Sequence, residues 1–458
     1  MRPGTVDREE NPVGCCAPSA STRLIDLTGR SSRKGGHVVE PETFAWLVGI
    51  DWGSAEHALC LREADGTVVG TRRVPHEARA IHDAVQWLRQ QTQAVPAAIA
   101  VAIETPRGVL VDTLLEQGFA VFALNPKQLD RFRDRFTVAG AKDDDRDAEV
   151  LSDSLRTDRR AFRRVRADDP VIIQLRELCR IGEDLQREEG RLTNRLREQL
   201  YRVDAAWLAL SPAADDPWLW AILAETPEPG AWATLPRRRI TPALRAHRIR
   251  RVTADDVVTT LRQPRLTPAA GVPEAVALRI ASLVPQLRLL HEQRRDTERQ
   301  IDRRLAQLAP TETDDNEPRE YRDVEILRSL PGVGRMVTAT MLTEVSGPLA
   351  DRDYGTLRAH VGAAPVTKRS GKRMRVVQMR YACKGRARDA VHHWARVSIQ
   401  CDPAARAYYE ALRARGHHHA RALRSVADRW LRILVAMLKA GTLYDGAHFA
   451  QKHAVVPA

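Results

Sequence analysis

The chain has 458 residues, with 72 Lys and Arg against 59 Asp and Glu, which gives a net charge of +13. This length allows several domains with sizeable cores, and the basic surplus makes nucleic acid the first partner to consider, although an Arg-rich composition from a GC-rich genome would give the same surplus. The cysteines form no Cys-x-x-Cys pair, no apolar run approaches membrane-spanning length, and no apolar signal segment opens the chain, so we expect a cytoplasmic protein without a zinc ribbon, a disulfide framework or a membrane span.

The N-terminal part of the chain predicts an α/β domain. Residues 1–42 are rich in Gly, Pro, Ser and charge and are expected to be disordered, and the domain occupies residues 43–160. Its expected elements are strands at 44–51, 57–62 and 67–74, a helix at 77–93, a strand at 97–104, a helix at 108–117, a strand at 119–124 and a helix at 144–155. Three meandering strands followed by right-handed crossovers give the order of the ribonuclease-H-like fold, in which the fourth strand lies beside the first.

Carboxylates mark the ends of these elements. Asp51 and Glu104 each close a buried strand, so in this topology they would lie side by side at the carboxyl edge of the sheet. Asp144 and Asp147 share a helical face, as do Asp143 and Asp147, although acidic residues at a helix start are also favoured by the helix dipole alone. Four carboxylates from three elements suit two Mg²⁺ ions about 4 Å apart, with Mn²⁺ as the alternative, and hence phosphodiester cleavage or transfer.

Two long helices are expected in residues 161–310. Leucines repeat along one side of 171–202 and of 274–308, which predicts an antiparallel coiled coil, within one chain or between chains. Between them, residues 203–270 predict a small helical insertion with four tryptophans. These side chains either fill a core or stack on bases, and a core is the more common place for tryptophan.

The remaining residues predict a polar linker at 311–322, a mostly α-helical C-terminal domain at 323–445 and a tail at 446–458. A helix, a Pro-Gly-Val-Gly turn and a second helix predict a helix-hairpin-helix element, in which Gly332 and Gly334 let backbone N–H groups approach a DNA phosphate. A plain turn between two helices would read the same.

A serine lies in a strongly basic segment of the same domain. Ser370 precedes a glycine, and basic residues surround it, namely Lys368, Arg369, Lys372, Arg373 and Arg375. These side chains predict nucleic-acid contact. Taken alone, Ser-Gly between basic residues predicts a turn over a phosphate rather than a nucleophile, because a hydroxyl is weakly nucleophilic at neutral pH and no base is adjacent in sequence.

Taken together and in order, five motifs resemble those of the DEDD insertion-sequence transposases. They are Val48-Gly-Ile-Asp51, Ile103-Glu104, Gly140-Ala-Lys142 with Asp144-x-x-Asp147-Ala148, Leu330-Pro-Gly-Val-Gly334, and Arg369-Ser370-Gly371-Lys372. The resemblance covers about residues 44–440. In that family a RuvC-like domain is joined by a coiled coil to a C-terminal transposase domain that carries a serine nucleophile, and some members are guided by a bridge RNA.

The resemblance implies roles for individual residues. Asp51, Glu104, Asp144 and Asp147 would hold the metal ions, and Ser370 would attack a DNA phosphate to form a transient phosphoserine link. Asp143 stands where the family commonly has Thr or Ser, so it stays an alternative to Asp144, which the spacing from Lys142 and to Asp147 favours. The resemblance also implies a bacterial, nucleoid-associated recombinase that acts on element ends and target DNA. It would work as a homodimer or homotetramer, with the two sites contributed by different subunits.

Two other functions fit the same residues. A junction-resolving nuclease would use the carboxylates with water as the nucleophile and would not need Ser370. A non-catalytic remnant would only bind DNA or RNA, but the carboxylates and the Ser-Gly pair are all present, which favours an enzyme.

Overall fold

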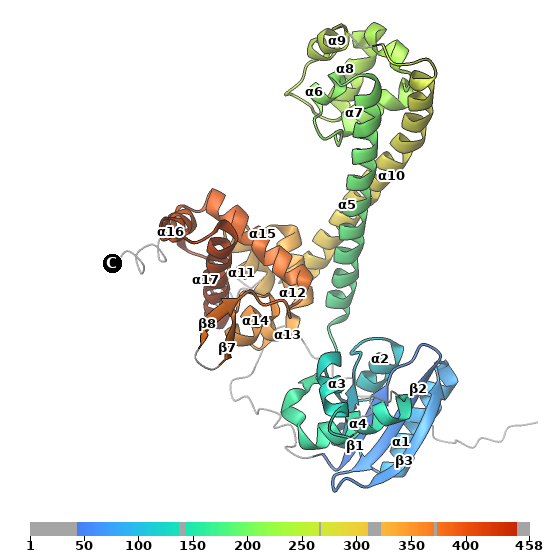
Figure 1. Cartoon of the computed structure of the whole chain (residues 1–458), viewed down its shortest axis with the longest axis vertical. Helices are drawn as coiled ribbons and strands as arrows, with labels where there is room; N and C mark the ends of the chain where they lie inside the picture. Colours follow the sequence, from blue (N-terminus) through green and yellow to red (C-terminus); the bar gives the residue numbers. More distant parts are fainter. Residues whose placement is uncertain (1–43, 137–142, 265–266, 310–321, 371–372, 447–458) are drawn as a thin grey trace, which may run out of the picture. The chain divides into compact units, whose positions relative to one another are not determined.

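The structure is a computed structural model that describes residues 44–136, 143–264, 267–309, 322–370 and 373–446 (Figure 1). For residues 367–370 and 373–378 it describes the backbone alone. The predicted disordered segment 1–42, nearly all of the linker 311–322 and all but the first residue of the tail 446–458 lie outside the described residues. The chain divides into two compact units, residues 1–167 and 168–458, and each is described by itself.

A six-stranded sheet organises the N-terminal unit, with the strand order β3-β2-β1-β4-β5-β6. Its strands are β1 (Trp46–Asp51), β2 (Glu56–Glu63), β3 (Val68–Pro75), β4 (Ile99–Ile103), β5 (Ala120–Ala123) and β6 (Arg163–Arg164). The first three strands pair antiparallel, and β4 and β5 run parallel to β1. The predicted order and the place of β4 beside β1 are confirmed. Strand β6, which pairs antiparallel with β5, was not predicted.

Helices cover both faces of this sheet. Alternate side chains of β1 and β4, such as Val48 and Ile103, pack with α1 (Ala78–Thr92) and α2 (Val109–Glu116). The intervening side chains, such as Leu47 and Ala102, pack on the opposite face with α3 (Pro126–Arg133) and α4 (Asp144–Thr157). This division follows from the two-residue repeat of a strand, which sends successive side chains to opposite faces. The mixed sheet with helices on both sides agrees with a ribonuclease-H-like domain.

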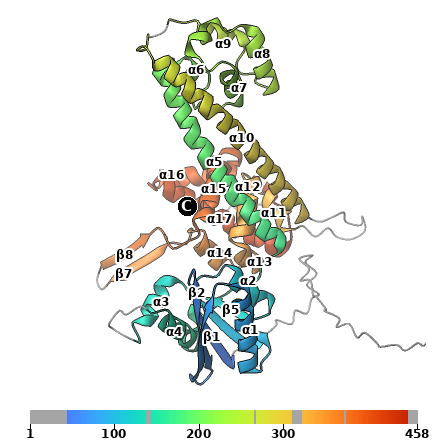
Figure 2. The same cartoon turned by 90° about the vertical axis from the view of Figure 1, so that its right-hand side faces the viewer.

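Two long helices form the stem of the second unit. Helices α5 (Pro170–Val203) and α10 (Val272–Gln307) lie side by side and run in opposite directions, as Figures 1 and 2 show. Gly182 lies against Thr297, and the buried carboxylate of Glu189 accepts a hydrogen bond of 2.7 Å from Arg294. The two helices therefore pair within one chain, while regular coiled-coil packing remains a prediction.

The residues between the long helices form a small helical domain with its own core. Its helices are α6 (Ala206–Leu210), α7 (Pro217–Glu225), α8 (Arg237–Ala246) and α9 (Ala254–Leu261). Trp207, Trp218, Trp220 and Trp232 are all fully buried there. Two indole N–H groups donate to backbone carbonyls, Trp220 to Ala214 and Trp232 to Thr226. The structure thus decides between the two alternatives: these tryptophans fill a core.

The C-terminal part is mostly helical and packs on the stem where α5 begins and α10 ends. Its helices are α11 (Asp323–Ser329), α12 (Arg335–Glu344), α13 (Ser346–Ala350), α14 (Tyr354–His360), α15 (Gly385–Cys401), α16 (Pro403–Ala414) and α17 (His419–Ala440). Leu175 of α5 and Ile301 of α10 share one core with them. Between α14 and α15 the chain forms an antiparallel hairpin, β7 (Val366–Ser370) and β8 (Arg373–Gln378). In the described part of the chain, no helix is long and apolar enough to cross a membrane.

Candidate active site

Asp51 and Glu104 lie at the same edge of the N-terminal sheet. Ile50 pairs with Ile103 in the parallel β1–β4 ladder, so the next residues along the two strands are Asp51 and Glu104. Gly49 and Ala102, two residues earlier, face α3 and α4, and the two-residue repeat directs both carboxylates to that same face. Both residues are half-buried. The predicted juxtaposition at the ends of the two strands is confirmed at the level of the backbone.

Helix α4 reaches this edge because it lies directly on the backbone of β1. A Cβ atom built on Gly49 would stand 1.9 Å from the carbonyl oxygen of Ala148 and 2.6 Å from the backbone nitrogen of Ser152. Only glycine allows so close an approach. Ser152 lies beside Cys60, which pairs with Gly49, and Ala148 packs with Ala58, which pairs with Asp51. The helix therefore runs antiparallel to β1, and its N-terminus points to the edge that carries Asp51.

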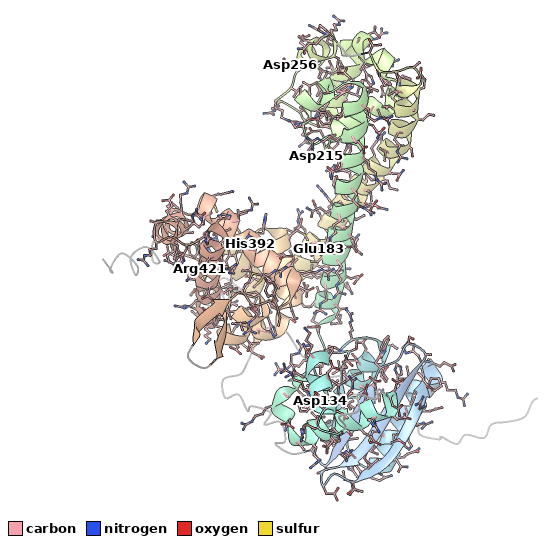
Figure 3. The ribbon with its side chains drawn as sticks, in the orientation of Figure 1. Asp134, Glu183, Asp215, Asp256, His392 and Arg421 are labelled. Atoms are coloured by element: carbon pink, nitrogen blue, oxygen red, sulfur yellow. The ribbon has the colours of Figure 1, made fainter. Side chains whose placement is uncertain are left out.

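Asp147, in the first turn of α4, is the most enclosed of the four predicted ligands. Its side chain is 1 % exposed, and it accepts two hydrogen bonds from Arg133 at the end of α3. Asp134, which follows Arg133 in the chain, is labelled in Figure 3. The pKa of Arg133 is raised, chiefly by the hydrogen bonds to Asp147, with further contributions from the charges of Asp130 and Glu104. Arg133 therefore lies within electrostatic reach of two predicted ligands that come from different elements.

The geometry separates Asp144 from Asp143. Asp143 precedes α4 and lies 3.8 Å from Arg73 of β3, which also bonds Asp145 at 2.9 Å. Asp144 is exposed. It precedes Asp147 by three residues and Ala148 by four, so it lies on the side of α4 that faces the sheet, beyond the edge of the sheet. This position favours Asp144 as the partner of Asp147. The Gly140-Ala-Lys142 motif lies outside the described residues.

The side chains of this edge are not gathered into a ligand set. Within the ranges that the structure describes, no group of three or more His, Cys, Asp or Glu side chains is placed to hold a metal ion. The donor atoms nevertheless fit such an ion, because hard carboxylate oxygens are the ligands that Mg²⁺ and Mn²⁺ prefer. The guanidinium of Arg133 shows, in addition, that this edge already binds a positive charge.

The two glycines of the predicted helix-hairpin-helix motif have different surroundings. Gly332 has a φ of +81°, and a Cβ built on it would lie 2.8 Å from the backbone nitrogen of Ser398 in α15. Trp394 of α15 donates a hydrogen bond to the carbonyl of Pro331 in the same turn. Gly334 is exposed at the start of α12, with nothing within 4 Å of a built Cβ. The turn thus packs Gly332 against α15, and a DNA contact by either glycine stays a prediction.

Ser370 closes β7 and pairs with Arg373 across the hairpin. Gly371 and Lys372 lie outside the described residues, as do the side chains of Lys368, Arg369, Ser370, Arg373 and Arg375. Backbone hydrogen bonds to α14 fix the chain on both sides of the hairpin. The N–H of Ala364 donates to the carbonyl oxygen of Arg358 at 2.9 Å, and the N–H of Lys384 donates to the carbonyl oxygen of His360 at 2.8 Å. Ser370 is therefore the last residue of a strand in a two-stranded hairpin anchored on α14, and the turn predicted at Ser370-Gly371 falls largely outside the described residues.

Sequence comparison connects both units to one family. A family model described as a transposase matches residues 48–203, and the model of the IS116/IS110/IS902 transposase family matches residues 324–410. A candidate transposase of Sinorhizobium fredii, y4uE, is 48% identical over 53% of this chain and 67% of its own length. The uncharacterized 43.6 kDa protein of element IS110 from Streptomyces coelicolor is 30% identical over 67% of this chain and 72% of its own length.

The chain belongs to the IS110 family of transposases. A candidate transposase of the mini-circle element IS117 from Streptomyces coelicolor is 28% identical over 89% of this chain and 96% of its own length, so the similarity extends over nearly the whole protein. The first model spans all four predicted carboxylates, and the second spans Gly332, Gly334 and Ser370. Membership implies a DNA-binding enzyme that cuts and rejoins DNA, and a DEDD domain of the kind that works with divalent metal ions.

Two residues important for this geometry did not emerge from the sequence. Gly49 stands inside the first motif, where a glycine in a strand signals the close approach of another backbone. Arg133 belongs to a short basic segment whose weak apolar periodicity did not predict a helix. A prediction of α3 from Asn125 and Pro126, which are favourable at the start of a helix, would have placed Arg133 near the edge of the sheet that carries Asp51 and Glu104 (the acidic edge).

Proposed function

We propose that this IS110-family transposase cuts and rejoins DNA strands by joint action of the acidic edge in the N-terminal unit and Ser370 in the C-terminal unit. The observation that carries the proposal is the placement of Asp51 and Glu104 in register on the face where α4 docks. Asp144 and Asp147 belong to the first turn of α4, and the N-terminus of this helix points to that edge. Asp51, Glu104, Asp144 and Asp147 would hold two Mg²⁺ ions, or Mn²⁺ in their place.

The metal ions would supply electrostatic stabilisation of the attacking and leaving oxygens during an in-line displacement. The chain supplies the nucleophile. In the proposed step, the Oγ of Ser370 forms a bond to phosphorus, one P–O bond of the DNA breaks, and the serine proton ends on the released strand hydroxyl. The phosphoserine link conserves the energy of the phosphodiester, so the reverse attack by another strand hydroxyl completes rejoining. Basic residues around Ser370 would neutralise the neighbouring phosphates.

Three further features are proposed from the family resemblance. A structured bridge RNA would select the DNA, a homodimer or homotetramer would bring the two sites together from different subunits, and the protein would associate with the nucleoid. RNA that copurifies with the full chain and is protected from nuclease would support the first feature. Light scattering of the complex with DNA would measure the second.

A covalent-adduct assay tests the proposal. The full chain is incubated with Mg²⁺ and end-labelled DNA containing the element ends, and the products are separated under denaturing conditions. The wild type should give a labelled protein–DNA adduct, Ser370→Ala should give none, and Glu104→Gln should give neither adduct nor cleavage. Cleavage that persists in Ser370→Ala would identify a nuclease that uses water. Binding without Mg²⁺-dependent cleavage in the wild type would identify a non-catalytic remnant.

A further inference from the structure

Helix α3 places Arg133 next to Asp147 at the acidic edge. Asn125 caps the start of this helix, because its side-chain oxygen accepts a hydrogen bond from the backbone N–H of Lys127. Leu129 is completely buried in the core under α4. Arg133 lies four residues after Leu129, so the two side chains share the helical face that points to the sheet and α4. At the end of the helix, Arg135 bonds Asp158 at 2.7 Å, which ties this end of α3 to the far end of α4.

The contact of Arg133 with Asp147 uses both oxygens of the carboxylate. Nη2 donates to Oδ2 at 2.5 Å, Nε donates to Oδ1, and Nη1 bonds Asp130 at 2.6 Å. This bidentate pairing is the strongest arrangement that arginine makes with a carboxylate, and here the carboxylate is almost completely enclosed. Arg133 keeps one-fifth of its own side-chain surface exposed, so it is less enclosed than Asp147.

We propose that Arg133 is a positioning residue that holds Asp147 in place of a divalent cation, and that cation binding at this edge requires the bond between Arg133 and Asp147 to open. The inference rests on the proposed function, since it assigns Asp147 as a ligand. A carboxylate whose two oxygens both accept from arginine has its best lone pairs occupied, and a divalent ion beside the guanidinium would be repelled by it. Metal affinity is therefore set by a competition within the chain.

The competition has a functional consequence. With Arg133 in place, the buried negative charge of Asp147 is neutralised and α4 stays docked without a metal ion. If the bond between Arg133 and Asp147 opened, the guanidinium would become available to a DNA phosphate, whose oxygens arginine can contact with two hydrogen bonds. Metal and DNA would therefore bind with positive coupling.

The test is the affinity of the full chain for Mg²⁺, measured by calorimetric titration without DNA. Arg133→Gln should bind Mg²⁺ about tenfold more tightly than the wild type, the scale expected when one charge-assisted pair no longer competes. Arg135→Gln is the matched control, because it removes the same charge from the same end of α3 but its partner is Asp158. Its affinity should change less than twofold. Luminescence of Tb³⁺ sensitised by Trp52, the residue after Asp51, gives an independent readout at the site.

Further variants exclude a purely structural role. Arg133→Lys keeps a cation that cannot pair bidentately, so its affinity should lie between those of the wild type and Arg133→Gln, and it provides the test if Arg133→Gln fails to fold. In an Asp147→Asn background the replacement of Arg133 should no longer tighten binding. Equal or weaker binding by Arg133→Gln and Arg133→Lys would overturn the inference while leaving the proposed function intact. If neither the wild type nor any of these variants binds Mg²⁺ saturably, both the inference and the proposed function would be overturned.

Discussion

Replacing Gly49 with alanine tests how the acidic edge is built. Gly49 lies in the middle of β1, and its missing side chain leaves the space in which the backbone of α4 rests. A Cβ at this position would lie 1.9 Å from the carbonyl oxygen of Ala148, 2.6 Å from the nitrogen of Ser152 and 2.9 Å from the carbonyl carbon of Ala148. All three atoms belong to the helix backbone, so no side-chain rotation relieves the overlap.

The size of the effect follows from these distances. Ordinary van der Waals contact begins at 3.4 Å, so α4 must move by about 1.5 Å, the difference between 3.4 and 1.9 Å. Overpacking of a core by a methyl group costs about 1–3 kcal/mol, and the rigid neighbours at this site place Gly49→Ala at the upper end, about 3 kcal/mol. The same displacement would carry Asp144 and Asp147 away from Asp51 and weaken Mg²⁺ binding.

Amide hydrogen exchange of the full chain tests this prediction, because it measures the local stability of each helix and strand separately. In Gly49→Ala, amides of α4 and β1 should exchange roughly a hundredfold faster, as about 3 kcal/mol of lost local stability implies. Gly190→Ala is the control: it adds the same methyl group in the exposed interior of α5, with nothing within 4 Å of the new Cβ. It should stabilise α5 by about 0.5–1 kcal/mol. Wild-type protection of α4 in Gly49→Ala would refute the close packing of this helix on β1.

Two other predictions concern stability. Burial and then the neighbouring His76 lower the pKa of His57 from its ordinary 6.5, so the folded chain takes up this proton less readily than the unfolded chain. The stability that neutral His57 contributes is present above about pH 6.5 and decreases as the pH falls below it. The free energy of urea unfolding of the N-terminal unit should therefore depend less on pH in His57→Gln than in the wild type. Identical pH profiles for the two proteins would contradict this assignment. In the C-terminal unit, Gly332→Ala combines a positive φ with a Cβ placed only 2.8 Å from the backbone nitrogen of Ser398, and it should lower the free energy of unfolding in urea by about 2–3 kcal/mol. Gly334→Ala, which has open space, should cost less than about 1 kcal/mol, and equal costs for the two would mean that the turn does not pack on α15.

Much of the fold was predictable because the sequence patterns are local. The apolar runs that end in Asp51 and Glu104 mark buried strands, and their order fixes the parallel pairing that brings the two carboxylates together. The leucine repeats of α5 and α10 predicted the paired stem. The four tryptophans could be assigned to a core only once their burial was known, because stacking on bases and packing in a core require the same side chain.

The rest depends on contacts between distant segments. Helix α3 has eight residues and one completely buried side chain, Leu129, so its apolar periodicity is too weak to read. The pairing of Arg133 with Asp147 joins two helices, and nothing in either segment specifies it. Gly332 shows the same limit, since a glycine that lets a phosphate approach and a glycine that lets α15 approach have the same sequence signature.

The most direct test of the central claim is mass spectrometry of the protein–DNA adduct formed with Mg²⁺ by the full chain. The account predicts a nucleotide phosphate linked to Ser370, with no adduct after Asp51→Asn or Asp144→Asn. An adduct on any other residue, or strand cleavage by Ser370→Ala at the wild-type rate, would contradict it.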